Sequence, residues 1–214
     1  AFRAIRRAGE LIDMTRHHGE HPRLGATDVC PLVPVSGLTL DDAAELARQL
    51  AERVGRELNL PVYLYEHAQP DAKRRNLADI RAGEYEGLAA KIRRPEWRPD
   101  FGPAAFDARR GATVIGARDF LAAFNVNLDT PSRDLAHEIA CDVRTSGRVI
   151  RDPSGTEKRL PGTLRAAKAI GWYIPEYGRA QVSMTLTQLG VTPVHAAFEA
   201  VRAAAAARGV RVTG

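Results

Sequence analysis

Three histidines near the end of the first predicted helix carry the side chains best suited to chemistry. They are His17, His18 and His21. Gly19 interrupts the helical spacing that would direct two of them at one metal ion, and no cysteine lies nearby, so the pattern disfavours a metal site. An acid/base role suits His21 better, because Pro22 keeps the residue before it out of helical geometry and an imidazole ordinarily titrates near neutral pH. A surface histidine at the helix C-terminus is the alternative interpretation.

Three further patterns are weak indications of a site. The stretch from Gly111 to Arg118 has the glycine spacing of a phosphate loop but lacks the required lysine and hydroxyl residue. The tripeptide from Asp100 to Gly102 occurs in kinases, yet no catalytic loop or strand lysine accompanies it. Cys30 lies in an apolar run with no helix N-terminus or cation beside it, which favours buried packing over nucleophilic chemistry.

Basic side chains are concentrated in loops, and the chain carries a net charge of +5. A solvated surface is the simplest interpretation of scattered charges. Nucleic-acid binding is disfavoured because these loops hold almost no aromatic residues on which bases could stack. A polyanionic ligand smaller than a nucleic acid is compatible with the net positive charge of the chain. The loop cations are Arg109, Arg110, Arg148, Arg151, Lys158, Arg159 and Arg165.

Composition is that of an ordinary globular protein. The 214 residues are 44% hydrophobic and 27% charged, enough for one large domain or two small ones. Two cysteines are too few for a disulfide framework, and the sequence has neither a signal peptide nor a long apolar run, so we expect a cytoplasmic protein without membrane association. Ala1 lies directly inside a helical pattern without an N-cap, and a strand that begins at Val210 stops at Gly214, so both ends look truncated.

The first half of the chain alternates predicted strands and helices. A strand is expected over 29–35, where its two prolines indicate a sheet edge or an irregular bend, and another over 61–65. Between them, Thr39 as N-cap and Asp42 three positions later predict a helix that runs to Leu58. A short helix is expected near 85–93, after which the loop 95–111 is rich in glycine and proline.

The second half repeats this order. A strand over 120–128 precedes a helix predicted to begin with Thr130 as N-cap and Pro131 in the first turn. A basic loop over 151–165, a strand over 180–186 and a last helix opened by Thr192 and Pro193 follow. Strand, helix, strand in both halves predicts two similar α+β units, each an antiparallel sheet with helices on one face. A doubly wound parallel fold is the competing prediction.

Seven motifs, in order along nearly the whole chain, resemble glutamate formimidoyltransferase, the formiminotransferase domain of formimidoyltransferase-cyclodeaminase. They are GEHPRLGA at 19–26, DVCP at 28–31, IRAGEYE at 80–86, PDFGP at 99–103, GAR at 116–118, AFNVNL at 123–128 and GWY at 171–173. The resemblance implies two ferredoxin-like subdomains with antiparallel or mixed sheets, at 1–117 and 118–214. The first would lack its start and the second its end.

The same resemblance implies an activity and a site. The formimidoyl group of N-formimidoyl-L-glutamate would pass to N5 of tetrahydrofolate in histidine degradation, in a homodimer, without a metal and without nucleic acid. The catalytic histidine falls on His21, which would take a proton from the attacking amine and give one to the departing glutamate amine. The folate-binding segment falls on Gly102, Pro103, Ala104, Ala105, Phe106, Asp107, Ala108, Arg109, Arg110 and Gly111.

Smaller expectations complete this hypothesis. Glycine-rich backbone and an aromatic ring such as Phe101 or Phe106 suit a flat pterin, and Arg109 and Arg110 would attract a polyglutamate tail. The side chains of Asn125, Asn127 and Gln181 could hold the glutamate. Two alternatives stay open: a formyltransferase that uses the same folate site, and a folate-binding protein without activity.

Overall fold

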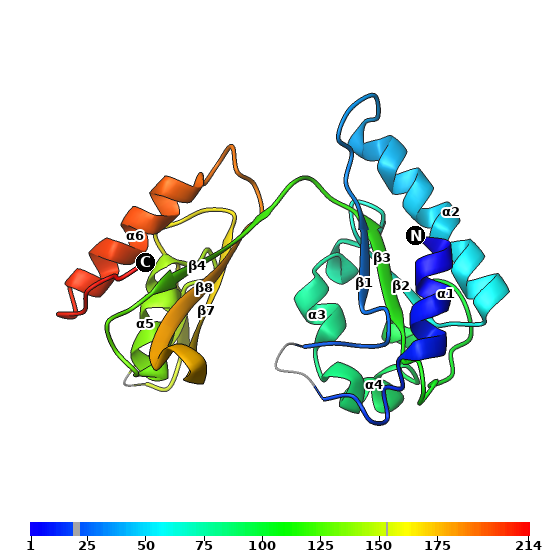
Figure 1. The fold of residues 1–214 in the computed structure, drawn as a ribbon, viewed down its shortest axis with the longest axis horizontal. Coiled ribbons are helices and arrows are strands. Elements are labelled where there is room, and N and C mark those ends of the chain that lie inside the picture. Colours follow the sequence, from blue (N-terminus) through cyan, green and yellow to red (C-terminus); the bar gives the residue numbers. More distant parts are fainter. Residues whose placement is uncertain (19–21, 153) are drawn as a thin grey trace. The chain divides into compact units, whose positions relative to one another are not determined.

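The computed structural model describes residues 1–18, 22–152 and 154–214 and divides them into two compact units, 1–119 and 120–214 (Figure 1). The first unit contains α1 (Phe2–Leu11), β1 (Val29–Leu32), α2 (Leu40–Leu58), β2 (Val62–Glu66), α3 (Leu77–Arg81), α4 (Glu84–Lys91) and β3 (Thr113–Ala117). The second contains β4 (Ala122–Asn127), α5 (Arg133–Val143), β5 (Arg148–Arg151), β6 (Glu157–Leu160), β7 (Ala167–Ile174), β8 (Arg179–Leu186) and α6 (Val194–Ala206). Single turns of 3-10 helix lie at Ala72–Arg74, Pro95–Trp97 and Pro175–Tyr177. The predicted α+β class with a separate main sheet in each half is confirmed.

Helix α2 begins and ends at the residues that its sequence predicts. Thr39 Oγ1 accepts a hydrogen bond from the backbone N–H of Asp42 at 3.1 Å, and the backbone N–H of Thr39 donates to Asp42 Oδ2 at 2.9 Å. These two bonds form a capping box, which satisfies backbone donors that the first helical turn leaves free. At the other end, Asn59 adopts the left-handed conformation that commonly terminates a helix.

The sheet of the first unit differs from the antiparallel arrangement that was predicted. Its strand order is β1-β3-β2, and both outer strands run parallel to β3, with Val29 beside Val114 and Val62 beside Thr113. Helices lie between consecutive strands of this unit, which is the connection that parallel pairing requires. The prediction failed because β3 was not recognised. Its five residues are all buried, so the alternation typical of a half-exposed strand is absent.

Helices cover both faces of this parallel sheet rather than one (Figure 1). On one face, α1 and α2 pack on Val62 and Leu64 of β2 and on Ile115 of β3. On the other face, α3 and α4 pack on Tyr63 and Tyr65 of β2. Successive residues of a strand point to opposite faces, so one short strand serves two apolar layers. The position of β1 at the edge, where Pro31 is tolerated, is as predicted.

Lys91 at the end of α4 ties this helix to α3. It is only 6% exposed, and its ammonium donates to the carbonyl oxygens of Asp79, Ile80 and Ala82 at 2.6, 2.6 and 3.1 Å. The ammonium also lies 4.0 Å from the centroid of the Trp97 ring. These contacts hold the turn between α3 and α4 in place, since carbonyls at a helix C-terminus have no partner within the helix.

Replacing Lys91 by methionine is expected to lower the free energy of unfolding by about 1–3 kcal/mol, because the chain length is kept while the buried carbonyls lose their donor. The midpoint of urea unfolding measures this loss. Lys73→Met is the control, since Lys73 is exposed in the structure and its replacement should change stability by less than about 0.5 kcal/mol. Equal midpoints for wild type and Lys91→Met would contradict the capping role.

The second unit has the predicted antiparallel sheet with helices on one face. Its strand order is β4-β8-β7, with Val126 opposite Val182 and Gly171 opposite Val182 on the other side. Side chains of α5 and α6, such as Ile139 and Val201, form one apolar core with Val126 and Val182. The opposite face of this sheet carries polar residues at the alternate positions of β4 and β8, as the period of a half-covered strand requires.

Several details of the second unit correct the sequence-based predictions. The N-cap of α5 is Ser132, which accepts from the backbone N–H of Leu135, whereas Thr130 was predicted. Thr130 instead accepts from the backbone N–H of Ser132, because hydroxyl residues can cap nearby turns as well as helices. The predicted basic loop over 151–165 contains part of a hairpin formed by β5 and β6, and β7 was missed.

Candidate active site

The segments on either side of residues 19–21 lie against the end of the predicted folate-binding segment. On the N-terminal side, the backbone N–H of Met14 donates to the carbonyl of Arg109 at 2.9 Å. On the C-terminal side, the backbone N–H of Ala26 donates to the carbonyl of Arg110 at 2.9 Å, and Leu24 accepts from Ala112 at 3.1 Å. Two motifs about eighty residues apart in sequence are therefore joined through their backbones. His21 itself lies outside the described residues, so its catalytic role stays a prediction.

Glycines permit this close contact. Gly25 and Gly111 form an isolated antiparallel bridge, and Gly111 has a φ of +69°, in the left-handed region that favours glycine. Gly102, at the other end of the predicted folate-binding segment, has a φ of +77° and lies against the carbonyl of Leu60. Glycines at both ends of the segment therefore determine where it leaves and rejoins the sheet.

Gly25→Ala tests this junction. A Cβ at Gly25 would lie 2.3 Å from the carbonyl oxygen of Ala112 and 2.4 Å from that of Arg110, so the two backbones would have to separate. We expect the free energy of unfolding to fall by about 1–3 kcal/mol. Urea unfolding measures it, with Gly87→Ala as the control, because a Cβ at Gly87 meets no atom within 4 Å and alanine favours a helix. A loss no larger than that of the control would show that the junction tolerates separation.

Arg23 connects the segment after residue 21 to the start of α4 and back to His17. Its guanidinium contacts both oxygens of Glu86, at 2.7 and 3.0 Å, and Glu84 Oε2 at 3.2 Å. It also donates to the backbone carbonyl of His17 at 3.1 Å. Arg23 is 9% exposed, and its hydrogen bond to Glu86 lowers the pKa of that carboxyl. One side chain therefore links the backbone at His17 to the first turn of α4.

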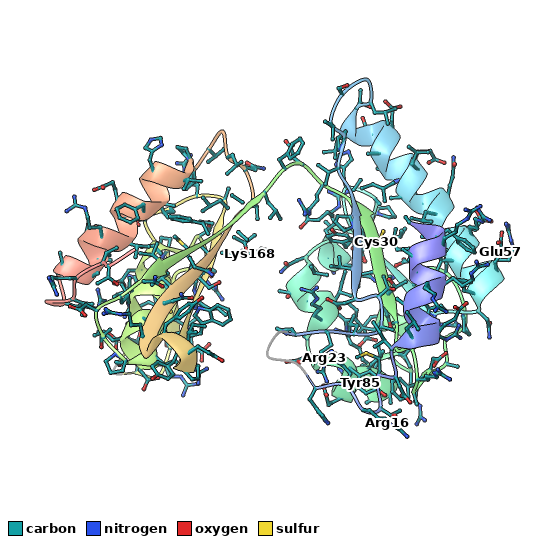
Figure 2. The ribbon with its side chains drawn as sticks, in the orientation of Figure 1. Arg16, Arg23, Cys30, Glu57, Tyr85 and Lys168 are labelled. Carbon is teal, nitrogen blue, oxygen red and sulfur yellow. The ribbon has the colours of Figure 1, made fainter. Side chains whose placement is uncertain are left out.

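Tyr85 extends this cluster to the predicted folate-binding segment. The Arg23 guanidinium lies 5.9 Å from the centroid of the Tyr85 ring, and both side chains are labelled on the same part of the first unit in Figure 2. The Tyr85 hydroxyl donates to the backbone carbonyl of Ala108, and its ring lies 5.5 Å from that of Phe106. Burial raises the pKa of the Tyr85 hydroxyl. A chain of contacts therefore runs from Arg23 through Tyr85 to the middle of the 102–111 segment.

The residues of the 102–111 segment differ in exposure and in partners. Ala104, Ala105 and Arg109 are exposed, and Phe106 is half-buried. The Arg110 guanidinium is held within the first unit, by the carboxylate of Asp107 and by the carbonyls of Leu58 and Asn59. Arg109 donates to the carbonyl of Glu10 at 3.0 Å. Arg110 therefore shapes the loop, whereas Arg109 stays at the surface.

In the second unit, two of the three predicted glutamate-binding residues form one hydrogen-bonded row with a tryptophan. Gln181 Nε2 donates to Asn127 Oδ1 at 2.5 Å, and Trp172 Nε1 donates to Gln181 Oε1 at 2.9 Å. Gln181 is 6% exposed and lies between the other two in the strand register. Asn125 lies two residues away on the exposed side of β4, opposite Ser183. The row fixes the orientation of the Gln181 and Asn127 amides on the face of the sheet opposite α5 and α6.

Sequence reasoning assigned no role to Arg23, Tyr85, Glu84 or Glu86, although all four lie in the quoted motifs. Arg23 is separated from the two glutamates by 61 and 63 residues in the sequence. A pattern of neighbouring residues does not predict an ion pair over that separation. The one feature that could have indicated this ion pair is that the motif at 19–26 contains an arginine and the motif at 80–86 contains two glutamates. Across residues 1–18, 22–152 and 154–214, no group of three or more His, Cys, Asp or Glu side chains could hold a metal ion.

Comparison with known proteins identifies the family. The model of the N-terminal subdomain of the formiminotransferase domain matches residues 1–118, and the model of the formiminotransferase domain matches residues 123–214. The chain belongs to the formiminotransferase domain family. The resemblance drawn from its seven motifs is thereby confirmed, and the two matched regions correspond closely to the two structural units.

Several curated relatives support the same family. The chain is 42% identical to a glutamate formimidoyltransferase of Streptococcus pyogenes serotype M1 over 100% of its own length and 67% of the relative's. It is 41% identical to one from Thermoplasma acidophilum, over 98% of the chain and 65% of the relative. It is 50% identical to a formimidoyltransferase-cyclodeaminase of Sus scrofa, over 93% of the chain and 35% of the relative. The chain thus spans about a third of the length of this animal relative. Within the described ranges, no helix has the length and hydropathy needed to cross a membrane.

Proposed function

We propose that this chain transfers the formimidoyl group from N-formimidoyl-L-glutamate to N5 of tetrahydrofolate, giving 5-formimidoyltetrahydrofolate and glutamate. One observation carries the proposal: the segments that flank His21 are hydrogen-bonded to the predicted folate-binding segment within one unit. An acid/base group and a folate loop must act on the same reacting atoms, so they have to share a site. The names of the relatives point to the same transfer.

The 102–111 segment has features that suit tetrahydrofolate as co-substrate. Phe106 is half-buried and packs on Tyr85, so its ring is held in place while part of it stays accessible to a flat pterin. Several small residues leave the backbone accessible, and backbone groups can hydrogen-bond the edge of a heterocycle. Arg109 at the surface suits an anionic glutamate tail, and binding of polyglutamylated folate should weaken as salt rises.

Each part of the site would then have a distinct task. His21 would accept the proton that the folate amine loses and return one to the departing glutamate amine, a kind of help that contributes about 10²- to 10⁴-fold in rate. Arg23 would be a positioning residue, since it joins the His17 backbone, shortly before His21 in the chain, to Glu86 of α4. That Asn127 and Gln181 of the second unit hold a glutamate stays a prediction from the sequence. A place in histidine degradation and a homodimer stay predictions from the resemblance, and a cytoplasmic location stays a prediction from the composition of the sequence.

Turnover with two donors, measured beside folate binding by calorimetry, tests the proposal. The full chain is incubated with tetrahydrofolate and either N-formimidoylglutamate or N-formylglutamate, and formation of the substituted folate is followed by absorbance and mass spectrometry. We expect transfer from the formimidoyl donor. Transfer from the formyl donor alone would indicate a formyltransferase, and folate binding without any turnover would indicate a binding protein. Either result would overturn the proposed activity.

A further inference from the structure

An open pocket of about 350 Å³ in the first unit has an unusual charge balance. His18, Arg23, Gly83, Glu84 and Glu86 line it. One guanidinium faces two carboxylates, so with a neutral histidine the group carries one net negative charge. A monocation bound in this pocket would complete the charge balance. Apart from this charge balance, the Nε of Arg23 is a buried donor without a hydrogen-bond partner among the residues described, and it calls for an acceptor atom rather than a cation.

The two carboxylates are not equivalent. Both oxygens of Glu86 accept from Arg23, so Glu86 makes a two-pronged ion pair with the guanidinium. Glu84 contacts Arg23 through Oε2 alone, at 3.2 Å, and its side chain is 42% exposed. In the part of the chain that the structure describes, no hydrogen bond or ion pair is found for its second oxygen, Oε1. Glu84 therefore keeps one oxygen outside the ion pair, whereas both oxygens of Glu86 already contact Arg23.

The backbone at Glu84 is strained in a way that presents its side chain. Gly83 and Glu84 have successive φ angles of +87° and +52°, a conformation that glycine adopts freely but glutamate disfavours. A strained backbone conformation persists only where the surrounding contacts hold the residue in it. Residues of this kind are concentrated at binding sites. The contact of Glu84 with Arg23 fixes the direction of its carboxylate within the pocket.

We propose that Glu84 binds the cationic formimidoyl group of the donor and so makes the site selective for a formimidoyl over a formyl group. This inference rests on the proposed function and names the residue that selects its donor. An amidine is protonated near neutral pH and presents planar N–H groups, which pair well with a carboxylate. A formyl group is neutral and places a carbonyl oxygen where the amidinium has N–H, so it would set an acceptor against the Glu84 acceptor. The same carboxylate attracts one donor and disfavours the other.

Glu84→Gln tests the inference, because glutamine keeps the size and can still accept from Arg23 while it loses the charge. Dissociation constants for N-formimidoylglutamate and N-formylglutamate are measured by calorimetry, together with kcat/KM for transfer to tetrahydrofolate. For the formimidoyl donor we expect binding and kcat/KM to fall about tenfold, the effect of one lost charge-assisted hydrogen bond. For the formyl donor we expect binding to change by less than about twofold or to tighten.

Glu86→Gln is the matched control. It removes a carboxylate from the same pocket and the same arginine, but its oxygens are used by Arg23, so both donors should be affected alike. Glu84→Gly is a second variant that guards against misfolding, since glycine adopts a φ of +52° without strain and the urea midpoint should stay equal or rise. It should lose the discrimination between donors just as Glu84→Gln does.

The possible outcomes separate this inference from the proposed function. If the wild type transfers the formimidoyl group but Glu84→Gln weakens both donors equally, or neither, the role of Glu84 is wrong and the activity stands. If no donor is turned over but Glu84→Gln selectively weakens binding of the formimidoyl compound, the pocket is selective and the proposed activity fails. If the wild type binds neither donor, both are overturned.

Discussion

Replacing His21 by alanine is expected to lower kcat for formimidoyl transfer by about 10²- to 10⁴-fold, the contribution that a positioned acid/base group typically makes. Proton removal from the attacking amine and proton delivery to the leaving amine would both then depend on water. Folate binding should change little, because contacts of the 102–111 segment do not require an imidazole. Steady-state kinetics and calorimetry with tetrahydrofolate measure the two quantities separately.

His195→Ala is the control for the His21 variant. His195 is exposed on α6 in the second unit, and its replacement should leave turnover within about twofold of wild type. Wild-type turnover by His21→Ala would show that another group moves the protons. A parallel loss of folate affinity and turnover would instead indicate that His21 contributes to binding.

Arg23→Lys is expected to lower kcat by about 10²-fold while the protein stays folded. Lysine keeps the charge but cannot contact both oxygens of Glu86 and the carbonyl of His17 at once, because an ammonium lacks the planar fork of a guanidinium. The backbone at His17 would then lose its link to α4, and a misplacement of about 1 Å in a catalytic site can cost about 10²-fold in rate. Arg23 acts here as a positioning residue, so kcat should fall far more than the affinity for tetrahydrofolate.

The second unit offers a matched control for Arg23. Arg208 is also largely buried and contacts two carboxylates, those of Glu138 and Asp142, and one backbone carbonyl, that of Ala204. Arg208→Lys should lower the urea midpoint about as much as Arg23→Lys without a comparable fall in kcat. If both substitutions lowered kcat equally, the positioning role of Arg23 would be contradicted. The fall in kcat would then follow from lower stability of the folded protein.

The sequence predicted those features that depend on neighbouring residues. The capping box of Thr39 and Asp42 defined the start of α2, since its hydrogen bonds join residues three apart. The proline of β1 indicated an edge strand, and alternation indicated β8, because one face of the second sheet is not covered by helices. The N-cap of α5 was misplaced by two residues, since Thr130 and Ser132 both bond nearby backbone groups and only the folded chain distinguishes them.

The tertiary structure decided what local patterns do not contain. Strand β3 is buried on both faces, so its sequence shows no alternation, and without it the parallel order β1-β3-β2 could not be derived. The candidate site was likewise predicted only in part from the sequence. Motif resemblance identified the family and the two segments of the proposed site, but the contacts of Arg23 with Glu84 and Glu86 cross more than sixty residues. Pairings at that distance depend on how helices and strands pack together, and no run of neighbouring residues specifies them.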